Sequence, residues 1–155
     1  SFDEKMFGVV AKYKAGMCLM HSQGLPENMQ NKPHYENVLL DIYDYLKEKI
    51  AEAESTGISR KRIIIDPGIG FGKSFSHNME IIKKVSLFLG LGCPLMIGMS
   101  RKSFIGEIIS ERLPSARLSG SIAAMLKIVS NGVNIVRVHD VKETVDAMKV
   151  WNIFK

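Results

Sequence analysis

The fold is decided by the stretch Asp66-Pro67-Gly68-Ile69-Gly70-Phe71-Gly72-Lys73, which attaches one carboxylate and three glycines to the end of an apolar run. The run itself, Ile63-Ile64-Ile65, is β-branched, as is typical of a buried parallel strand. Asp66 is therefore expected where the strand leaves the core, and the glycines would let the following backbone approach a ligand closely. An ordinary Asp-Pro-Gly turn has the same composition, so this stretch alone leaves both interpretations open.

Three further apolar runs also end in polar or charged residues. Residues 17–20 lead into His21, residues 95–98 lead into Ser100-Arg101-Lys102-Ser103, and residues 135–138 lead into His139-Asp140. Apolar residues at helical spacing separate the runs at 38–53, 81–89 and 118–129, a further such segment at 145–151 follows the last run, and a similar segment at 2–13 precedes the first. This alternation predicts four parallel strands (17–20, 63–66, 95–98 and 134–138), side by side in sequence order and joined by right-handed crossovers.

Two of the predicted helices carry recognisable end signals. Ser76 suits the N-cap of the helix at 81–89, and Gly90 suits its end. Asp140, followed by Glu143, resembles a capping box for the last helix. These signals predict where the helices begin and end.

The carboxyl ends of parallel strands lie on one face of the sheet. His21, Asp66, Lys102, Arg137 and His139 all follow predicted strands, so they are expected to converge there. Barrels and open sheets of the α/β class place their active sites on this face. The convergence therefore favours an enzyme, although a histidine at a strand end is often only structural.

Composition excludes several classes of protein. The net charge is +5, but no basic run is interleaved with aromatic residues, so steering of an anionic substrate is favoured over nucleic-acid binding. Cys18 and Cys93 lie in or beside predicted strands without CxxC spacing, which indicates reduced core thiols. The sequence shows no signal peptide and no apolar segment long enough to cross a membrane, so a cytoplasmic protein is expected.

Length limits the architecture. The chain has 155 residues, whereas a complete (β/α)8 barrel needs about 250. Four strands make half of such a barrel, and an open four-stranded sheet is the alternative. We expect residues 1–155 to form a single partial domain, the C-terminal half of a TIM barrel whose N-terminal half is absent.

Five groups of residues together resemble dihydropteroate synthase. They are Met20-His21-Ser22-Gln23-Gly24-Leu25-Pro26 with Met29-Gln30, the stretch from Asp66 to Lys73, the stretch Gly98-Met99-Ser100-Arg101-Lys102-Ser103-Phe104-Ile105-Gly106, Arg112-Leu113 with Ser119-Gly120-Ser121, and Arg137-Val138-His139-Asp140-Val141. The resemblance covers essentially the whole chain and corresponds to the C-terminal half of that family.

The resemblance implies a transferase of folate biosynthesis. Such an enzyme joins 6-hydroxymethyl-7,8-dihydropterin diphosphate to para-aminobenzoate and releases pyrophosphate. The resemblance also implies Mg²⁺, whose main protein ligand is expected in the absent N-terminal half, with no metal ligand in this half. The isolated chain is expected to lack turnover and to form a homodimer or to self-associate through its open barrel edges.

The resemblance also assigns roles to individual residues. Asp66 would pair with the adjacent N–H and amino donors of the pterin, and Lys102 with its ring acceptors. Ser103, at the start of a short helix, would receive the aminobenzoate carboxylate. The full set of expected substrate-binding residues is Met20, Asp66, Phe71, Gly98, Ser100, Lys102, Ser103, Arg137 and His139, of which Lys102, Arg137 and His139 are also expected in catalysis.

Each of these assignments has a structural alternative. Arg137 and His139 are expected to hold the departing diphosphate, but Arg137 could instead form a structural pair with an aspartate. Phe71 and Met20 could line the ring pockets or simply pack in the core.

Three other kinds of protein share parts of the pattern. A corrinoid-type methyltransferase has the barrel and the pterin-binding aspartate, but it has no diphosphate for Arg137 and His139 to hold. A catalytically silent half-barrel used for assembly would not need polar residues at every strand end. A flavodoxin-like domain would need a phosphate loop after its first strand, and Met20-His21-Ser22-Gln23-Gly24 is a poor one.

Overall fold

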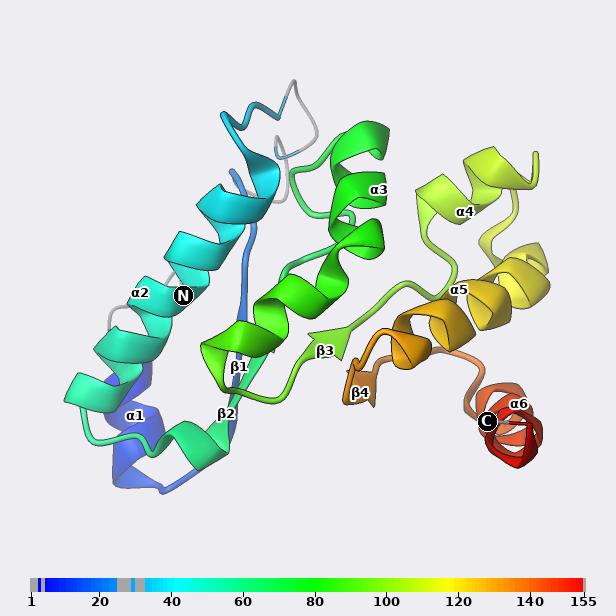
Figure 1. Ribbon diagram of the computed structural model, residues 1–155. Coiled ribbons are helices and arrows are strands. Elements are labelled where there is room, and N and C mark those ends of the chain that lie inside the picture. Colours follow the sequence, from blue (N-terminus) through cyan, green and yellow to red (C-terminus); the bar gives the residue numbers. More distant parts are fainter. Residues whose placement is uncertain (1–2, 4, 25–28, 30–32, 155) are drawn as a thin grey trace.

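The computed structural model describes residues 3, 5–24, 29 and 33–154, in which parallel strands alternate with helices (Figure 1). The order of the strands and α-helices is α1 (Met6–Lys12), β1 (Met17–Met20), α2 (Val38–Ser55), β2 (Ile63–Asp66), α3 (Phe75–Lys83), β3 (Met96–Ile97), α4 (Ser103–Ile108), α5 (Leu118–Ser130), β4 (Ile135–Val136) and α6 (Val141–Ile153). Three 3₁₀ segments lie between them: η1 (Arg60–Arg62), η2 (Val85–Leu91) and η3 (Pro114–Arg117).

The four strands run parallel in sequence order, as predicted. β1 pairs with β2 in a register that sets Met20 opposite Asp66, and β3 pairs with β4. A single parallel bridge between Ile65 and Leu95 connects the two pairs, and the Ile65 N–H donates to the Pro94 carbonyl at 2.9 Å. The arrangement is a partial (β/α) barrel.

β3 and β4 are only two residues long, shorter than the predicted 95–98 and 134–138. Pro94 has no N–H to donate, and the Leu95 N–H is taken by the Asn134 side chain at 2.9 Å instead of by a strand partner. Beyond β4 the Arg137 N–H still donates to the Ile97 carbonyl at 3.0 Å. The strand pairing therefore continues one residue into the loop that carries Arg137.

One face of the sheet is covered by helices and the other is open. α2 and α3 lie on the same side of β1 and β2 (Figure 1). The strand residues that face the helices are fully or almost fully buried: Leu19, Ile63, Ile65, Leu95 and Ile97. Their sequence neighbours Cys18 and Met20 are exposed, and Ile64 and Met96 are half-buried. We call the side of the sheet on which these four residues lie the open face.

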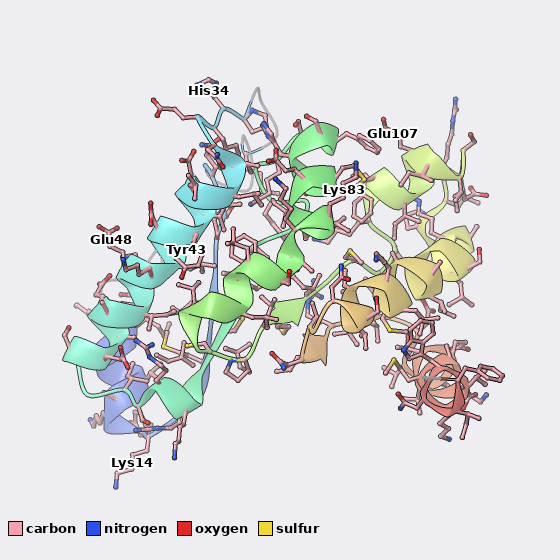
Figure 2. The ribbon with its side chains drawn as sticks, viewed as in Figure 1. Lys14, His34, Tyr43, Glu48, Lys83 and Glu107 are labelled. Carbon is pink, nitrogen blue, oxygen red and sulfur yellow. The ribbon has the colours of Figure 1, made fainter. Side chains whose placement is uncertain are left out.

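α2 follows its predicted pattern. Its core side consists of Val38, Leu39, Ile42, Leu46, Ile50 and Ala53, all buried. Its outer surface is charged, and Figure 2 shows Glu48 directed away from the strands. The predicted helix at 2–13 is observed as α1, in which Met6 and Val9 are exposed while Phe7 and Val10 are buried. The predicted apolar stripe of α1 was therefore partly wrong.

Several predicted helix ends were also wrong. α3 is capped by Ser74, not Ser76, because the His77 ring accepts from the Ser74 N–H and completes a capping box. After α3 the chain continues as the 3₁₀ segment η2. This segment ends at Gly92, whose φ is +70°, instead of at the predicted Gly90. Asp140 precedes α6 without capping it, because its carboxylate pairs with Arg101.

The last two helices bury fewer of their apolar residues than expected. In α5 the buried residues are Ser121, Met125 and Ile128, and in α6 Thr144 is buried whereas Val145 is exposed. Within the described part of the chain, none of the helices combines the length and apolar character needed to cross a membrane.

Candidate functional site

Residues 66–73 form a loop, here called the Asp66 loop, whose path depends on glycine. Gly68, Gly70 and Gly72 have φ of +72°, +80° and +63°, a region that other residues rarely adopt. A Cβ at Gly68 would lie 1.8 Å from the His21 carbonyl oxygen, and one at Gly72 would lie 2.3 Å from the Gln23 carbonyl oxygen. The glycines therefore let the Asp66 loop pack directly on the segment that follows β1.

Asp66 is buried at the end of β2. Its Oδ1 accepts from the Gly68 N–H at 2.7 Å. Burial raises the pKa of the Asp66 carboxyl, while the Gly68 hydrogen bond and the positive charges of Lys102 and Arg137 act in the opposite direction. A buried carboxylate surrounded by cations can pair with a ligand that presents several N–H donors.

Lys102 lies over the Asp66 loop. Its Nζ donates to the Ile69 carbonyl at 2.6 Å and stands 4.0 Å from the centre of the Phe71 ring, a cation–π contact. Burial lowers the pKa of Lys102 to about 8, with the charge of Asp66 opposing and that of Arg137 adding to the effect. Lys102, Phe71 and Asp66 thus belong to one cluster at the ends of β2 and β3.

Arg137 and His139 extend this cluster to β4. The Arg137 guanidinium lies against Gly98, where a Cβ would stand 3.1 Å from Nη2. The His139 Nδ1 lies 3.0 Å from the Ser100 Oγ, and the His139 N–H donates to the same oxygen at 3.3 Å. Each of the two residues therefore contacts the strand end or loop of β3, and Gly98 leaves the space that the guanidinium fills.

The open face links Arg137 to the first strand. Cys18 is exposed on the open face, but neighbouring protein atoms partly shield its thiol from water. This partial desolvation and the charge of Asp66 raise the pKa of the thiol to about 11, while the charge of Arg137 lowers it. Met20 is partly exposed on the same strand and lines a groove of about 440 Å³ beside the edge of β1, together with Met6, Tyr45 and Lys49. This groove adjoins the cluster around Asp66 but does not include it.

Ser103 is the first residue of α4, and Lys102 occupies the N-cap position. Ser103 is exposed, in contrast to the buried Phe104 and Ile105 that follow it. The structure therefore leaves its side chain accessible next to the cluster. The family segment at 25–28, with Gln30, lies outside the described residues.

His21 is held by Lys73 beneath the Asp66 loop. The Lys73 Nζ lies 3.0 Å from the His21 Nδ1 and donates to the Phe71 carbonyl at 2.9 Å. Burial lowers the pKa of His21 to about 3 and that of Lys73 to about 7, and the charge of Lys73 adds to the effect on His21. His21 is therefore neutral near pH 7 and joins the segment after β1 to the Asp66 loop.

The loop after β3, residues 100–103, is here called the Lys102 loop. Arg101 has a left-handed backbone, with φ of +60°, and its side chain pairs with Asp140, with Nε 3.1 Å from Oδ2. The aspartate pairing considered for Arg137 is thus made by Arg101. This ion pair joins the Lys102 loop to the start of α6.

Comparison with known proteins agrees with this arrangement. The family model for pterin binding enzymes matches residues 1–139. The chain belongs to the pterin-binding enzyme family. Dihydropteroate synthase from Neisseria meningitidis serogroup C is 50% identical over 137 residues, which make up 88% of this chain and 48% of that protein. The chain therefore spans about half the length of this relative.

Solved structures show the same fold. A dihydropteroate synthase from Stenotrophomonas maltophilia, with imidazole bound in its active site, superimposes with a TM-score of 0.94 at 41% identity, covering 98% of this chain and 57% of that one. The enzyme from Xanthomonas albilineans in complex with 7,8-dihydropteroate has a TM-score of 0.90 at 38% identity, covering 98% and 55%.

Sequence reasoning missed two sets of contacts in this family member. Lys73, Arg101 and Ser121 lie in stretches that resemble the family, but only the fold shows that Lys73 reaches His21. Arg117 and Ser121 contact the Lys102 loop from η3 and α5, and Arg101 reaches Asp140. The residues in these contacts are 16 to 52 positions apart, and neither spacing nor composition signals such pairs.

Proposed function

We propose that this chain is the pterin-binding half of a dihydropteroate synthase. The protein would join 6-hydroxymethyl-7,8-dihydropterin diphosphate to para-aminobenzoate and release pyrophosphate. The observation that carries the proposal is the cluster at the strand ends, where the buried carboxylate of Asp66 is influenced by the charges of both Lys102 and Arg137. The family membership and the neighbour bound to 7,8-dihydropteroate support it.

In this proposal the pterin ring lies between Asp66 and Lys102. The free acceptor capacity of the Asp66 carboxylate would take the ring N–H and amino donors as a bidentate pair. Lys102 would donate to the ring acceptors, and Phe71 and Met20 would supply apolar walls. Because Lys102 already lies over the Phe71 ring at 4.0 Å, little rearrangement is needed to bring its ammonium to a planar ligand.

Arg137, His139 and Ser100 would hold the diphosphate, while Gly98 lets the guanidinium lie close to the strand. The aniline nitrogen of para-aminobenzoate attacks the methylene carbon of the pterin and loses a proton, and the C–O bond to the diphosphate breaks. The electron pair leaves with pyrophosphate, so cations at this position stabilise the charge that develops. Ser103 would contact the carboxylate of para-aminobenzoate.

The Mg²⁺ expected from the family resemblance is not assigned to this chain. Among residues 3, 5–24, 29 and 33–154, no group of three His, Cys, Asp or Glu side chains stands close enough to hold a metal ion. The Asp66 carboxylate, the acidic group of the cluster, already accepts from the Gly68 N–H and lies among cations. No step of the proposed reaction therefore uses a metal. Self-association and a cytoplasmic location remain predictions.

Binding of the pterin ring tests the proposal on this chain. Titration with 6-hydroxymethylpterin, followed by its fluorescence, should show saturable binding that weakens on the order of 100-fold in Asp66→Asn, because a charge-assisted bidentate contact is lost. Asp146→Asn, at an exposed carboxylate of α6, is the matched control and should bind as the unmodified chain does. Equal affinity of Asp66→Asn and the unmodified chain would remove Asp66 from the site.

Turnover tests the role of the cations in a full-length enzyme that contains this chain. Arg137→Ala should raise the KM for the pterin diphosphate far more than the KM for para-aminobenzoate, with 7,8-dihydropteroate measured by chromatography. Equal effects on both substrates would exclude a phosphate role for Arg137. A methyltransferase function would instead predict that no dihydropteroate forms at all.

A further inference from the structure

Arg101 has a backbone conformation that its surroundings must impose. Its φ of +60° is unfavourable for a residue with a side chain. Lys14 and Ser110, the other described non-glycine residues with positive φ, each follow the C-cap of a helix, where a left-handed residue is common. Arg101 instead precedes a helix, so helix termination does not explain its conformation.

Two side chains hold both backbone polar groups of Arg101. The Arg101 N–H donates to the Ser121 Oγ at 2.9 Å, and the Arg101 carbonyl accepts from the Arg117 Nη1 at 3.0 Å. The Ser121 hydroxyl in turn donates to the Arg117 carbonyl at 2.7 Å, which ties the two together. A different backbone conformation at Arg101 would break at least one of these bonds.

Arg117 is unusual because it is a buried cation that serves only carbonyl groups. Its Nε donates to Glu111 at 3.1 Å, its Nη2 to Arg112 at 2.6 Å and its Nη1 to Arg101. Within the described part of the chain, no ion pair joins it to a carboxylate. Burying a charge without a counter-charge is unfavourable, so simple packing would be better served by an apolar residue.

The protein also keeps room for this guanidinium. A Cβ at Gly106 in α4 would lie 2.5 Å from the Arg117 Nε, so α4 can cover Arg117 only because residue 106 is glycine. A Cβ at Gly120 would lie 2.6 Å from the Ile105 Cγ2, which shows how closely α4 and α5 approach. The surroundings of Arg117 are thus shaped to seat it at the Lys102 loop.

We propose that Arg117 and Ser121 are positioning residues that fix Lys102 through the backbone of Arg101. The peptide that leaves Arg101 leads directly to Lys102, so its orientation decides whether the Lys102 ammonium reaches the Ile69 carbonyl and the Phe71 ring. The inference rests on the proposed function, because Lys102 matters there as a contact to the pterin ring.

The test uses the 155-residue chain and 6-hydroxymethylpterin. Ser121→Ala should weaken binding of the pterin about tenfold, the scale of one lost hydrogen bond to a positioned loop. The decisive comparison repeats the substitution in an Arg101→Gly background, where a left-handed φ needs no support. There Ser121→Ala should change the affinity less than twofold relative to Arg101→Gly alone.

A second substitution and a second measurement keep the result interpretable. Arg117→Lys keeps the charge but loses the fork that reaches three carbonyls, so it should weaken pterin binding as Ser121→Ala does. Circular dichroism and the unfolding midpoint identify any variant that fails to fold, and hydrogen exchange at the Lys102 and Ser103 amides should be faster in both variants.

Each outcome decides one of the two proposals. If the unmodified chain does not bind the pterin, the proposed function fails in this chain, and exchange at Lys102 alone then decides on the positioning role. If both folded variants bind as the unmodified chain does, or if Ser121→Ala costs the same affinity in the Arg101→Gly background, the positioning role is overturned. Unchanged exchange at Lys102 would also overturn it.

Discussion

The Asp66 loop and the Lys102 loop lie at the ends of neighbouring strands and meet at the Ile69 carbonyl, yet they hold their shapes in different ways. The Asp66 loop takes its left-handed positions from Gly68, Gly70 and Gly72, which adopt them without strain. The Lys102 loop places a left-handed φ on Arg101 and relies on side chains from η3 and α5 to keep it there.

The difference shows two ways of building a rigid site. In the first loop the residues that need an unusual conformation are those that tolerate it, so the conformation belongs to the loop itself. In the second loop the conformation is imposed from outside, and the loop is only as ordered as its supports. Substitutions inside the first loop and outside the second loop should therefore have the larger effects.

The largest effect is expected from Gly68→Ala, which changes a residue inside the Asp66 loop. The new Cβ would combine a left-handed φ with a position 1.8 Å from the His21 carbonyl oxygen, so the free energy of unfolding should fall by about 4 kcal/mol. The matched control is Gly57→Ala, where φ is +90° but no atom lies within 4 Å. It should lose only about 1 kcal/mol in urea unfolding. Equal losses would show that packing on His21 contributes nothing.

The second-largest effect is expected from Gly106→Ala, which changes a residue of α4 outside the Lys102 loop. The added Cβ would lie 2.4 Å from the Glu111 carbonyl oxygen and 2.5 Å from the Arg117 Nε, so the free energy of unfolding should fall by about 2–3 kcal/mol. Gly8→Ala in α1 has open space around it and should instead stabilise the chain by up to about 1 kcal/mol. Urea unfolding of both variants measures the contrast, and a neutral Gly106→Ala would contradict the seat described for Arg117.

Lys73 gives the comparison a pH dependence, because it joins the Asp66 loop to His21. Its pKa is about 7 in the folded chain, against an ordinary value of about 10.4, so between these values the unfolded chain binds more protons. Stability should therefore rise with pH across this window. Relative to Lys73→Met, the unmodified chain should gain about 2 kcal/mol between pH 7 and 9. Urea midpoints at several pH values measure this gain.

The control for that experiment is Lys61→Met, which removes an exposed positive charge from η1. Its pH profile should follow that of the unmodified chain. Parallel profiles for Lys73→Met and the unmodified chain would contradict the buried environment of Lys73.

His21 acts at lower pH by the same reasoning: its pKa is about 3 when folded, so stability should be lost as pH falls from about 6.5 toward 3.

The smallest effect is expected from Asp140→Asn, which weakens one support of the Lys102 loop. Asp140 pairs with the Arg101 side chain near the surface, and such pairs contribute little, so thermal unfolding should shift down by about 2 °C. Asp146→Asn, which removes two more exposed pairs, with Lys142 and Lys149, should cause no measurable shift. A large loss in Asp140→Asn would mean that the side chain of Arg101, and not its backbone, holds the loop.

The same contrast explains what the sequence could predict. Parallel strand order follows from the βα alternation, and strand polarity places Asp66, Lys102 and Arg137 at one edge, where they are found. The glycines of the Asp66 loop indicate, from the sequence alone, that its backbone has an unusual conformation. The roles of these residues toward a ligand remain predictions.

What could not be predicted depends on choices between similar residues or on distant partners. Ser74 and Ser76 are both suitable helix caps, and the His77 ring decides between them. The Asp140 carboxylate could cap α6 but pairs with Arg101, 39 residues earlier in the chain. Nothing in the sequence around Arg101 indicates a left-handed φ, because the side chains that impose it lie in other elements.

The position of the supports around Arg101 has a consequence for the order in which the site can form during synthesis. His21, Gln23 and Tyr35, which pack on the Asp66 loop, precede it in the chain, and Asn78 follows it closely. The Lys102 loop has to wait for Ser121 and Asp140, which leave the ribosome 20 and 39 residues after Arg101. A nascent chain can therefore form the contacts around the Asp66 loop while the Lys102 loop still lacks its supports. The two parts of the cluster would then form one after the other.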